Sequence, residues 1–410
     1  MAFRVVAQAL EQRLNADHSD EQEVRCDCQQ PARYAGRKAK TFQSVLGPLL
    51  LQRAYYHCPA CQQGFYPRDR EWGLAGGALS PGVVRMVAAV GAAVSFQEGS
   101  QLLEELAGLQ VDAKQVERTA EALGREIDSD EHSNLVPLAS AHPPATLYLG
   151  VDGTAVPMRS EEVTGRAGKQ PDGSAKTREV KLCVVWSAEH RDSQGRPLRD
   201  PGSVSYSAAI ESAAIQENNP AGSEFYQRVA REATRRDFQK ASRRAVVGDG
   251  APWIWNLSEE LYPDAIQIVD RWHVKEHLCQ LGNLLYGPGS AQARNWIERR
   301  FQQLDHGRFD GLLRAVARHV RGCEAARKLL AYLKTNRLRM DYPRFEREGL
   351  CTSSGVVEAG CKVVIGARLK RAGMHWSLSG ANAIMALRCC RLSGRFQDVW
   401  ERRSDLRRAA

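Results

Sequence analysis

Four acidic residues stand where their carboxylates can act together. Asp152, Asp249 and Asp270 each lie within or directly after a short apolar run, and Glu358 follows two serines that can cap a helix. An apolar run closed by turn residues is typical of a buried strand, and ligands of open sheets gather outside the carboxyl ends of such strands. Because hard divalent cations take carboxylate oxygens as ligands, these residues predict a Mg²⁺ or Mn²⁺ site.

A second set of residues predicts a different metal. Four of the eleven cysteines form two close pairs, Cys26 with Cys28 and Cys58 with Cys61, and alternating apolar residues between the pairs favour a hairpin. Paired thiolates on two turns satisfy the tetrahedral geometry of Zn²⁺ and leave no ligand position open. The sequence therefore predicts a zinc ribbon whose metal is structural.

The composition favours a polyanionic partner. The chain has 410 residues, 43% of them hydrophobic, and its formal net charge is +9, with Lys and Arg recurring in pairs through the second half. No apolar run approaches the roughly 20 residues of a membrane span, and the N-terminus lacks the pattern of a signal peptide. We expect a cytoplasmic, nucleoid-associated protein that binds DNA and no membrane.

The aspartates fall on a recognisable succession of elements. The predicted order is strand, strand, strand, helix, strand, helix, strand, at residues 145–158, 179–187, 204–210, 224–238, 245–247, 253–261 and 265–269. This order is that of an RNase H-like fold. In that fold the first and fourth strands lie side by side, which would bring Asp152 and Asp249 together.

Helical patterns flank this core. Apolar spacing between Leu79 and Ile127 predicts helices that include a helix-turn-helix, with Lys114, Gln115 and Arg118 on the helix that would enter a DNA groove. Residues 128–144 read as a linker. After Val274 the chain is helical for a long stretch, and the next helix carries Glu358 with Lys362 four residues later on the same face.

The predicted fold class is therefore multidomain α+β, with an N-terminal zinc ribbon and helix-turn-helix and an RNase H-like α/β core interrupted by an all-α insertion. The expected segments are the zinc-ribbon module, the helix-turn-helix region, the first part of the core, the α-helical insertion and the C-terminal core helices with Glu358: residues 1–75, 76–142, 143–275, 276–348 and 349–410.

Long motifs along nearly the whole chain give it a resemblance to a known family. They include YYHCPACQQGFYPRD, AAVSFQEGSQLLEELAG, GVDGTAVPM, VVGDGAPWIWNL, IVDRWHVKEHL and SSGVVEAGCKVVIGARLKRAGMHWS. With these motifs the sequence resembles bacterial DDE transposases of the ISKra insertion-sequence family. The resemblance implies binding of terminal inverted repeats, metal-dependent strand cleavage and strand transfer into target DNA, by a homodimer or larger assembly on paired ends.

The resemblance also implies residue roles. Asp152, Asp249 and Glu358 match the DDE triad that holds two Mg²⁺ or Mn²⁺ ions, and Asp270 to His273 look like the D-x-x-H signature of related enzymes. Asp270 remains an alternative to Asp249 as the second ligand. Trp296 matches an insertion-domain aromatic that can stack a flipped base or simply pack in the core. The basic residues near Glu358 would hold the DNA strand: Lys362, Arg368, Lys370 and Arg371.

Two other functions stay open. His273, Glu276 and His277 spell the H-x-x-E-H arrangement of a zinc protease, with Glu346 or Glu348 as a third ligand. A transposase-derived DNA-binding regulator without catalytic activity is the second alternative, although all three carboxylates are present.

Overall fold

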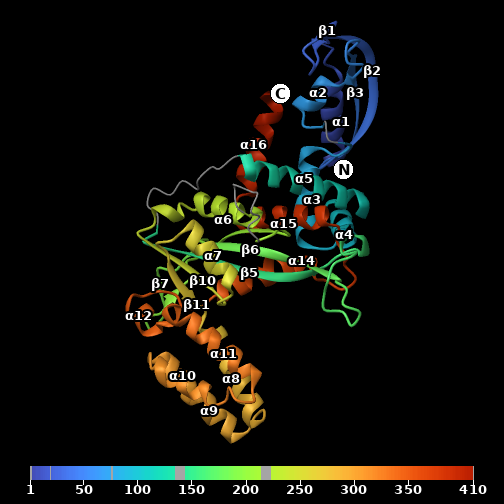
Figure 1. Cartoon of the computed structure of the whole chain (residues 1–410). Helices are drawn as coiled ribbons and strands as arrows, with labels where there is room; N and C mark the ends of the chain where they lie inside the picture. Colours follow the sequence, from blue (N-terminus) through green and yellow to red (C-terminus); the bar gives the residue numbers. More distant parts are fainter. Residues whose placement is uncertain (1, 19, 75–76, 134–143, 214–222, 410) are drawn as a thin grey trace. The chain divides into compact units, whose positions relative to one another are not determined.

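The chain folds as an α+β protein in two compact units (Figure 1). The computed structural model describes all residues except 1, 19, 75–76, 134–143, 214–222 and 410. Unit 1 comprises Met1–Asp130 with Gly394–Ala410, and unit 2 comprises Glu131–Ser393. The five predicted segments thus fall into two units, and the end of the last segment belongs to unit 1. Among the described helices, none has the length and apolar character needed to cross a membrane.

A four-stranded antiparallel sheet forms one part of unit 1, in the order β1-β2-β3-β4. The strands are Glu23–Arg25, Pro31–Ser44, Gly47–His57 and Gly64–Phe65. The long hairpin of β2 and β3 confirms the hairpin predicted between the cysteine pairs. Helix α1 (Ala2–Asn15) was not predicted; its Ala7 packs with Phe42 and Leu51 in the core beneath the hairpin.

The rest of unit 1 is helical. Helices α3 (Pro81–Ala93), α4 (Phe96–Ala107) and α5 (Ala113–Ser133) bury a common apolar core that includes Val87, Leu103 and Val116. The predicted turn lies between α4 and α5, where Gly108 adopts a left-handed φ of 63°. The predicted linker start was wrong: α5 continues past Asp128, and residues 134–143 lie outside the described part of the chain.

The C-terminal helix joins this unit through ion pairs. Arg402 and Arg403 of α16 (Phe396–Ala409) bind Asp130 and Glu126 of α5, with closest N···O distances of 2.6 and 2.5 Å. A short helix, α2 (Pro67–Glu71), precedes the helical part. The last residues of the segment predicted to complete the catalytic core, Gly394–Ala410, therefore belong to unit 1.

Unit 2 is built on a five-stranded mixed sheet in the order β11-β10-β5-β6-β9. Strand β5 pairs antiparallel with β6, as β6 does with β9, whereas β10 runs parallel to both β5 and β11. The bounds are Thr146–Pro157 for β5, Thr177–Ser187 for β6, Ser205–Ala209 for β9, Arg243–Gly248 for β10 and Ile266–Val269 for β11. The predicted neighbourhood of the first and fourth strands is confirmed by the pairing of β5 with β10.

Helices cover the two faces of this sheet. Lys181 lies near Trp253 of α7 (Pro252–Leu261), and α6 (Glu224–Arg235) packs on β6 and β9. The next residue of β6, Leu182, contacts Gly360 of α13 (Gly355–Gly360). Since neighbouring side chains of a strand point to opposite faces, α7 and α13 lie on opposite sides of the sheet. Helices α14 (Ala367–Leu369) and α15 (Leu378–Leu392) follow α13.

Between β11 and α13 the chain forms a series of helices, where an all-α insertion was predicted at residues 276–348. Its helices are α8 (Arg271–Tyr286), α9 (Ala291–Asp305), α10 (Phe309–Ala317), α11 (Glu324–Thr335) and α12 (Tyr342–Arg347). Figure 1 shows α8 to α11 gathered beside the sheet as a group of their own. A small hairpin, β7 (His190–Arg191) with β8 (Pro197–Leu198), follows β6 and was not predicted.

Candidate metal and nucleic-acid sites

The four paired cysteines form one cluster in unit 1, which we call the cysteine cluster. All four sulfurs lie within 4.8 Å of one another. The Sγ atoms of Cys26 and Cys61 are 3.6 Å apart, as are those of Cys28 and Cys58. These distances exclude disulfides, whose S–S bond is about 2.05 Å. They approach the ~3.8 Å sulfur spacing of a tetrahedron with Zn–S bonds of about 2.3 Å.

The turn after β3 favours the thiolate form of one of the four cysteines, Cys58. Backbone N–H groups of Cys61 and Ala60 lower the pKa of the Cys58 thiol to about 7. A thiolate is the form that binds metal, so this turn favours the ligand state of Cys58 near neutral pH. The cysteine cluster could thus hold a structural Zn²⁺ ion.

In unit 2, the strand register brings two aspartates together. Val247 of β10 pairs with Gly150 of β5, and the strands run in the same direction. Asp152 follows Gly150 by two residues within β5, and Asp249 follows Val247 by two residues just after β10, so the two aspartates lie beside each other at the carboxyl end of β10. Asp249 lies in the turn after β10, where its Oδ1 accepts a hydrogen bond from the N–H of Ala251 at 2.8 Å.

Glu358 reaches the same region from α13. Gly150 allows the close approach, because a Cβ atom at that position would lie 2.3 Å from Cγ2 of Val357. Of the two serines that could cap this helix, Ser354 makes no capping bond and its hydroxyl donates to Asp270, whereas the Ser353 hydroxyl oxygen accepts from the N–H of Gly355 at 3.1 Å. We call Asp152, Asp249 and Glu358 the carboxylate site.

The helix widens directly after Glu358. Residues Cys361–Gly366 form a π-helical turn, and the buried guanidinium of Arg388 donates to the carbonyls of Val363 and Val364. A π-turn frees backbone carbonyls that an α-helix would use, and such turns are frequent at functional sites. This turn brings Cys361, which was not singled out from the sequence, to Asp152: its Sγ lies 3.4 Å from Oδ2.

Like charges and burial shape the titration of the carboxylate site. Burial raises the pKa of Asp152 above its ordinary value, and the nearby carboxylates of Asp249 and Glu358 raise it further. Burial and the charge of Asp152 also raise the pKa of Cys361, so this thiol stays a neutral hydrogen-bond donor. A cation among the carboxylates would relieve their repulsion.

The three carboxylates are spread more widely than the cysteines. Within the described residues, the cysteine cluster is the only set of three or more potential ligands gathered around one point. Glu358 is exposed and lies 4.0 Å from the ammonium group of Lys362. A wide spread is compatible with two cations, which stand about 3.5–4 Å apart in two-metal sites and divide the ligands between them.

Asp270 has a different role from the one left open by the sequence. It is 1% exposed, and both of its oxygens are occupied by the protein. One oxygen accepts from the N–H groups of Trp272 and His273 at the start of α8, and the other from the N–H and hydroxyl of Ser354. Asp270 is therefore the N-cap of α8 and a tie to the segment before Glu358, whereas Asp249 is the more accessible of the two aspartates.

The H-x-x-E-H residues lie on α8 but lack a third ligand. The rings of His273 and His277 are 4.5 Å apart, and Glu276 lies 3.9 Å from His273. Glu346 binds Arg271 and Glu348 pairs with Arg344, so neither approaches as a ligand. Across the described ranges, no metal-ligand group includes these histidines.

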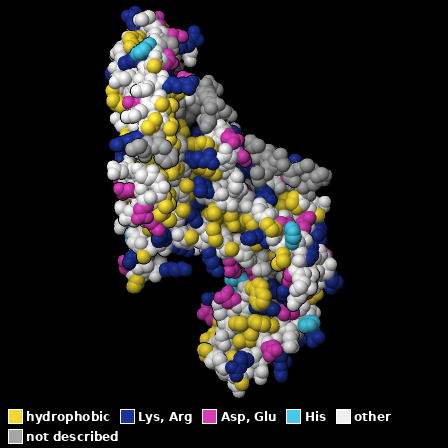
Figure 2. All heavy atoms as spheres, turned by 180° about the vertical axis from the view of Figure 1, so that it is seen from behind, with side chains coloured by type: hydrophobic (Ala, Val, Ile, Leu, Met, Phe, Trp, Pro, Cys, Tyr) yellow, Lys and Arg dark blue, Asp and Glu magenta, His cyan; other side chains and the backbone are white. Residues whose placement is uncertain are grey.

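The predicted DNA-contacting residues of unit 1 lie on α5. Lys114 and Arg118 are exposed and Gln115 is half-buried. The Lys114 ammonium pairs with Glu117 at 2.8 Å, which leaves it at the surface. Figure 2 shows basic side chains scattered among acidic ones over one face of the molecule, without a single dominant patch.

Of the four basic residues predicted near Glu358, three are accessible. Lys362, Lys370 and Arg371 are exposed, and the Lys370 ammonium donates to the Thr154 hydroxyl two residues after Asp152. Arg368 was wrongly predicted as a DNA contact. It is fully buried, with its guanidinium 5.1 Å from the ring centre of Trp376, because it falls on the inner face of its helix.

The two tryptophans of the insertion differ in exposure. Trp296 is half-buried between Tyr286 and His319, with ring centres 6.3 Å away from each, so it packs within the insertion. Trp272, which was not singled out, is 63% exposed and follows Asp270 by two residues. Trp272 lies within the D-x-x-H motif, so that motif was the sequence signal that could have drawn attention to it.

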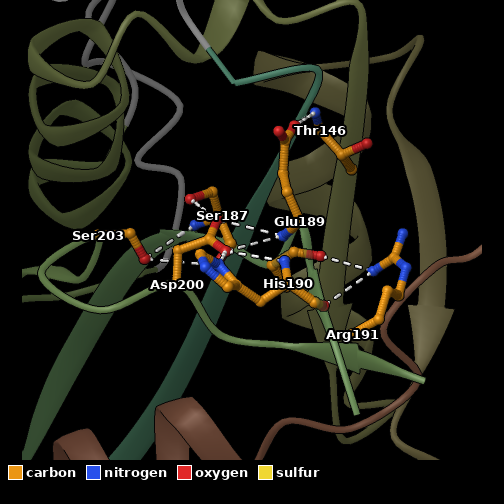
Figure 3. A network of polar contacts seen from close by, with 8 residues as sticks. Thr146, Ser187, Glu189, His190, Arg191, Asp200 and Ser203 are labelled. Atoms are coloured by element: carbon orange, nitrogen blue, oxygen red, sulfur yellow. Dashed lines mark hydrogen bonds and ion pairs between the residues drawn. The ribbon is translucent and has the colours of Figure 1, made fainter. Parts of the chain in front are cut away.

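Another polar cluster in unit 2 contains the residue types of a catalytic triad, serine, histidine and aspartate (Figure 3). Asp200 accepts hydrogen bonds from the Ser187 hydroxyl and from the ring and backbone of His190. In a catalytic triad the histidine lies between the serine and the aspartate. Here the aspartate lies between them, so His190 cannot activate Ser187. The cluster instead fastens the β7–β8 hairpin to the end of β6.

Comparison with protein-family models and with curated proteins gives no match for this chain.

Proposed function

We propose that the chain is a DDE transposase that binds the terminal inverted repeats of an insertion sequence, cleaves their strands and transfers them into target DNA. The observation that carries the proposal is the parallel register of β5 and β10, which sets Asp152 and Asp249 side by side. Glu358 approaches them on α13. This arrangement resembles the triad of the ISKra family in residue type and in order along the chain.

The sheet supports an RNase H-like core. Numbered along the chain, the five strands occur in the order 5-4-1-2-3, with the first three antiparallel and the last two parallel to the first. The all-α insertion separates the second aspartate from the glutamate, as the sequence motifs imply. The oxygen donor set of Asp152, Asp249 and Glu358 fits Mg²⁺ or Mn²⁺.

The residues of the carboxylate site would divide the work of phosphoryl transfer. Asp152, Asp249 and Glu358 would hold the divalent cations, which would activate the attacking oxygen and stabilise the leaving oxygen. Lys362, Lys370 and Arg371 surround the site with positive charge that would hold the phosphate backbone. The protonated thiol of Cys361 would orient Asp152 without binding a hard cation.

Unit 1 would supply DNA-end recognition. A zinc ribbon would fix the hairpin, and the α4–α5 pair would act as a helix-turn-helix with Lys114, Gln115 and Arg118 on the reading helix. We propose a homodimer or larger assembly on paired ends, because both ends of one element must be transferred into the same target DNA.

Plasmid nicking tests the proposal. The substrate is a supercoiled plasmid carrying the DNA that flanks this reading frame, incubated with wild type, Asp249→Asn or Glu276→Gln in Mg²⁺ or Mn²⁺. We expect cuts at the repeat ends with wild type and with Glu276→Gln, and a loss of at least about a hundredfold with Asp249→Asn while DNA binding persists.

Two outcomes would reject the assignment. Nicking that survives Asp249→Asn would remove Asp249 from the site. Repeat binding by the wild type without metal-dependent nicking would favour the DNA-binding regulator instead.

A further inference from the structure

A tyrosine of the insertion holds the turn that carries Asp249. Tyr332 of α11 donates its hydroxyl hydrogen to the backbone carbonyl oxygen of Asp249 at 2.7 Å. The neighbouring Gly250 has a φ of +97°, and a Cβ atom there would lie 2.5 Å from the Tyr332 ring. Gly250 is thus required both by the backbone conformation and by the closeness of the tyrosine.

The surroundings of Tyr332 keep it in this contact. A tyrosine hydroxyl carries its proton at neutral pH, so the group is a donor to the carbonyl oxygen of Asp249. The edge of its ring packs against His277 of α8, with ring centres 5.1 Å apart. Burial, followed by the proximity of His273, lowers the pKa of His277, which favours the neutral ring beside the tyrosine.

The contact reaches the carboxylate through the turn itself. The carbonyl of Asp249 is fixed by Tyr332, and its Oδ1 is fixed by the N–H of Ala251 at 2.8 Å. We propose that Tyr332 is a positioning residue of the carboxylate site, through which the all-α insertion holds Asp249 in the orientation that binds a divalent cation. This inference rests on the proposed function for the role of Asp249.

Tyr342 offers a matched control. Its hydroxyl also donates to a backbone carbonyl, that of Val269 at 3.1 Å, and its side chain is fully buried. Val269 precedes Asp270, which caps α8 and lies outside the carboxylate site. Replacement of either tyrosine by phenylalanine removes one hydroxyl that bonds a strand-end carbonyl, but only Tyr332 touches the Asp249 turn.

The experiment compares wild type, Tyr332→Phe and Tyr342→Phe in three measurements: plasmid nicking, Mn²⁺ binding by calorimetry, and hydrogen exchange of the Ala251 amide. For Tyr332→Phe we expect kcat to fall about fivefold or more, with KM for the plasmid unchanged, as loss of one hydrogen bond permits. We also expect weaker Mn²⁺ binding and faster Ala251 exchange. Tyr342→Phe should match wild type in all three.

The inference is overturned if Tyr332→Phe keeps wild-type Ala251 exchange and Mn²⁺ affinity. It is also overturned if Tyr342→Phe loses as much in both measurements, because the effect would then be a general loosening of the core. If the wild type fails to nick the plasmid, the proposed function fails. Exchange and Mn²⁺ binding would still decide whether Tyr332 positions Asp249.

Discussion

The cysteine cluster and the carboxylate site bring their candidate ligands together in opposite ways. The four cysteine sulfurs lie within 4.8 Å of one another on the turns that precede β2 and follow β3, at the open end of one hairpin. The carboxylate site draws on a strand, a turn and a helix far apart in the sequence, and its Glu358 is exposed. One set of ligands is assembled by local structure, whereas the other depends on the tertiary fold.

This difference in assembly matches the number of ligand positions that each kind of metal site leaves free on its cation. Four thiolates fill a tetrahedral zinc site, so its binding energy goes into folding the hairpin. Catalytic cations need free positions for water and phosphate, and their ligands must tolerate mutual repulsion before the cation binds. The raised pKa of Asp152 reflects that repulsion as well as burial. Under the proposed function, the carboxylate site is thus less preassembled than the cysteine cluster.

The largest effect is expected from removing Cys58, a candidate zinc ligand of the cysteine cluster. Zinc binding in small domains contributes about 10–16 kcal/mol to folding, so Cys58→Ser should lose the metal and unfold the β2–β3 hairpin. Because the two sheets lie in separate units, the unit 2 sheet should survive. Zinc content, circular dichroism and repeat-end binding measure the result. Cys323→Ser, a thiol outside the cysteine cluster, is the control.

A Cys58→Ser protein that keeps a full equivalent of zinc and wild-type end binding would contradict the closed site. The contrast between the two sites would then disappear, since neither would be preassembled.

A smaller effect should separate the two aspartates that follow β10 and β11. Asp270→Ala removes a helix cap and strands the Ser354 N–H, which should cost about 2–4 kcal/mol of unfolding free energy. Asp249→Ala should cost about 1 kcal/mol or less, because it loses only the bond from Ala251. Calorimetric unfolding of both variants, followed through unit 2, compares them.

If Asp249→Ala lost more unfolding free energy than Asp270→Ala, Asp270 would again be the alternative to Asp249 as a ligand of the carboxylate site. Mn²⁺ titration of the same variants provides an independent check, since only Asp249→Ala should weaken binding while unit 2 remains folded.

Local patterns were enough to predict most of the elements and one of the two sites. Apolar runs and turn residues placed the strands of unit 2 within a few residues, and cysteine spacing predicted the cysteine cluster. The role of Asp270 was not decidable, because a strand-end aspartate looks the same whether it caps a helix or stays available. Nothing local separated buried Arg368 from exposed Lys370 two residues later.

Contacts between distant segments account for the remaining differences. The π-turn at Cys361–Gly366 depends on Arg388, and the turn at Asp249 depends on Tyr332. Neither partner carries a signal in its own sequence neighbourhood. The helical pattern at Asp128 was present but was outweighed by the polar, Pro-rich stretch that follows it, so the linker was started too early.

The smallest effect concerns pH and compares two carboxylates with opposite environments. Burial, together with the neighbouring carboxylates, raises the pKa of Asp152, so its ionisation opposes folding. The stability it contributes is greatest below its ordinary pKa of 3.8 and is lost as pH rises through the folded pKa. Asp152→Asn should therefore raise the melting temperature of unit 2 by a few degrees at neutral pH in buffer without divalent cations. This gain in melting temperature should vanish below pH 3.8, where Asp152 is protonated in both the folded and the unfolded protein.

Asp200 provides the control with the opposite sign. Hydrogen bonds from Ser187 and His190 outweigh its burial and lower its pKa to about 2, so its contribution is present above pH 3.8 and is lost as pH falls toward 2. Asp200→Asn should lower the melting temperature at neutral pH and converge with wild type in acid. Equal signs for the two variants would show that the carboxylate site is not under repulsion, and would remove the physical basis for distinguishing it from an ordinary bonded carboxylate.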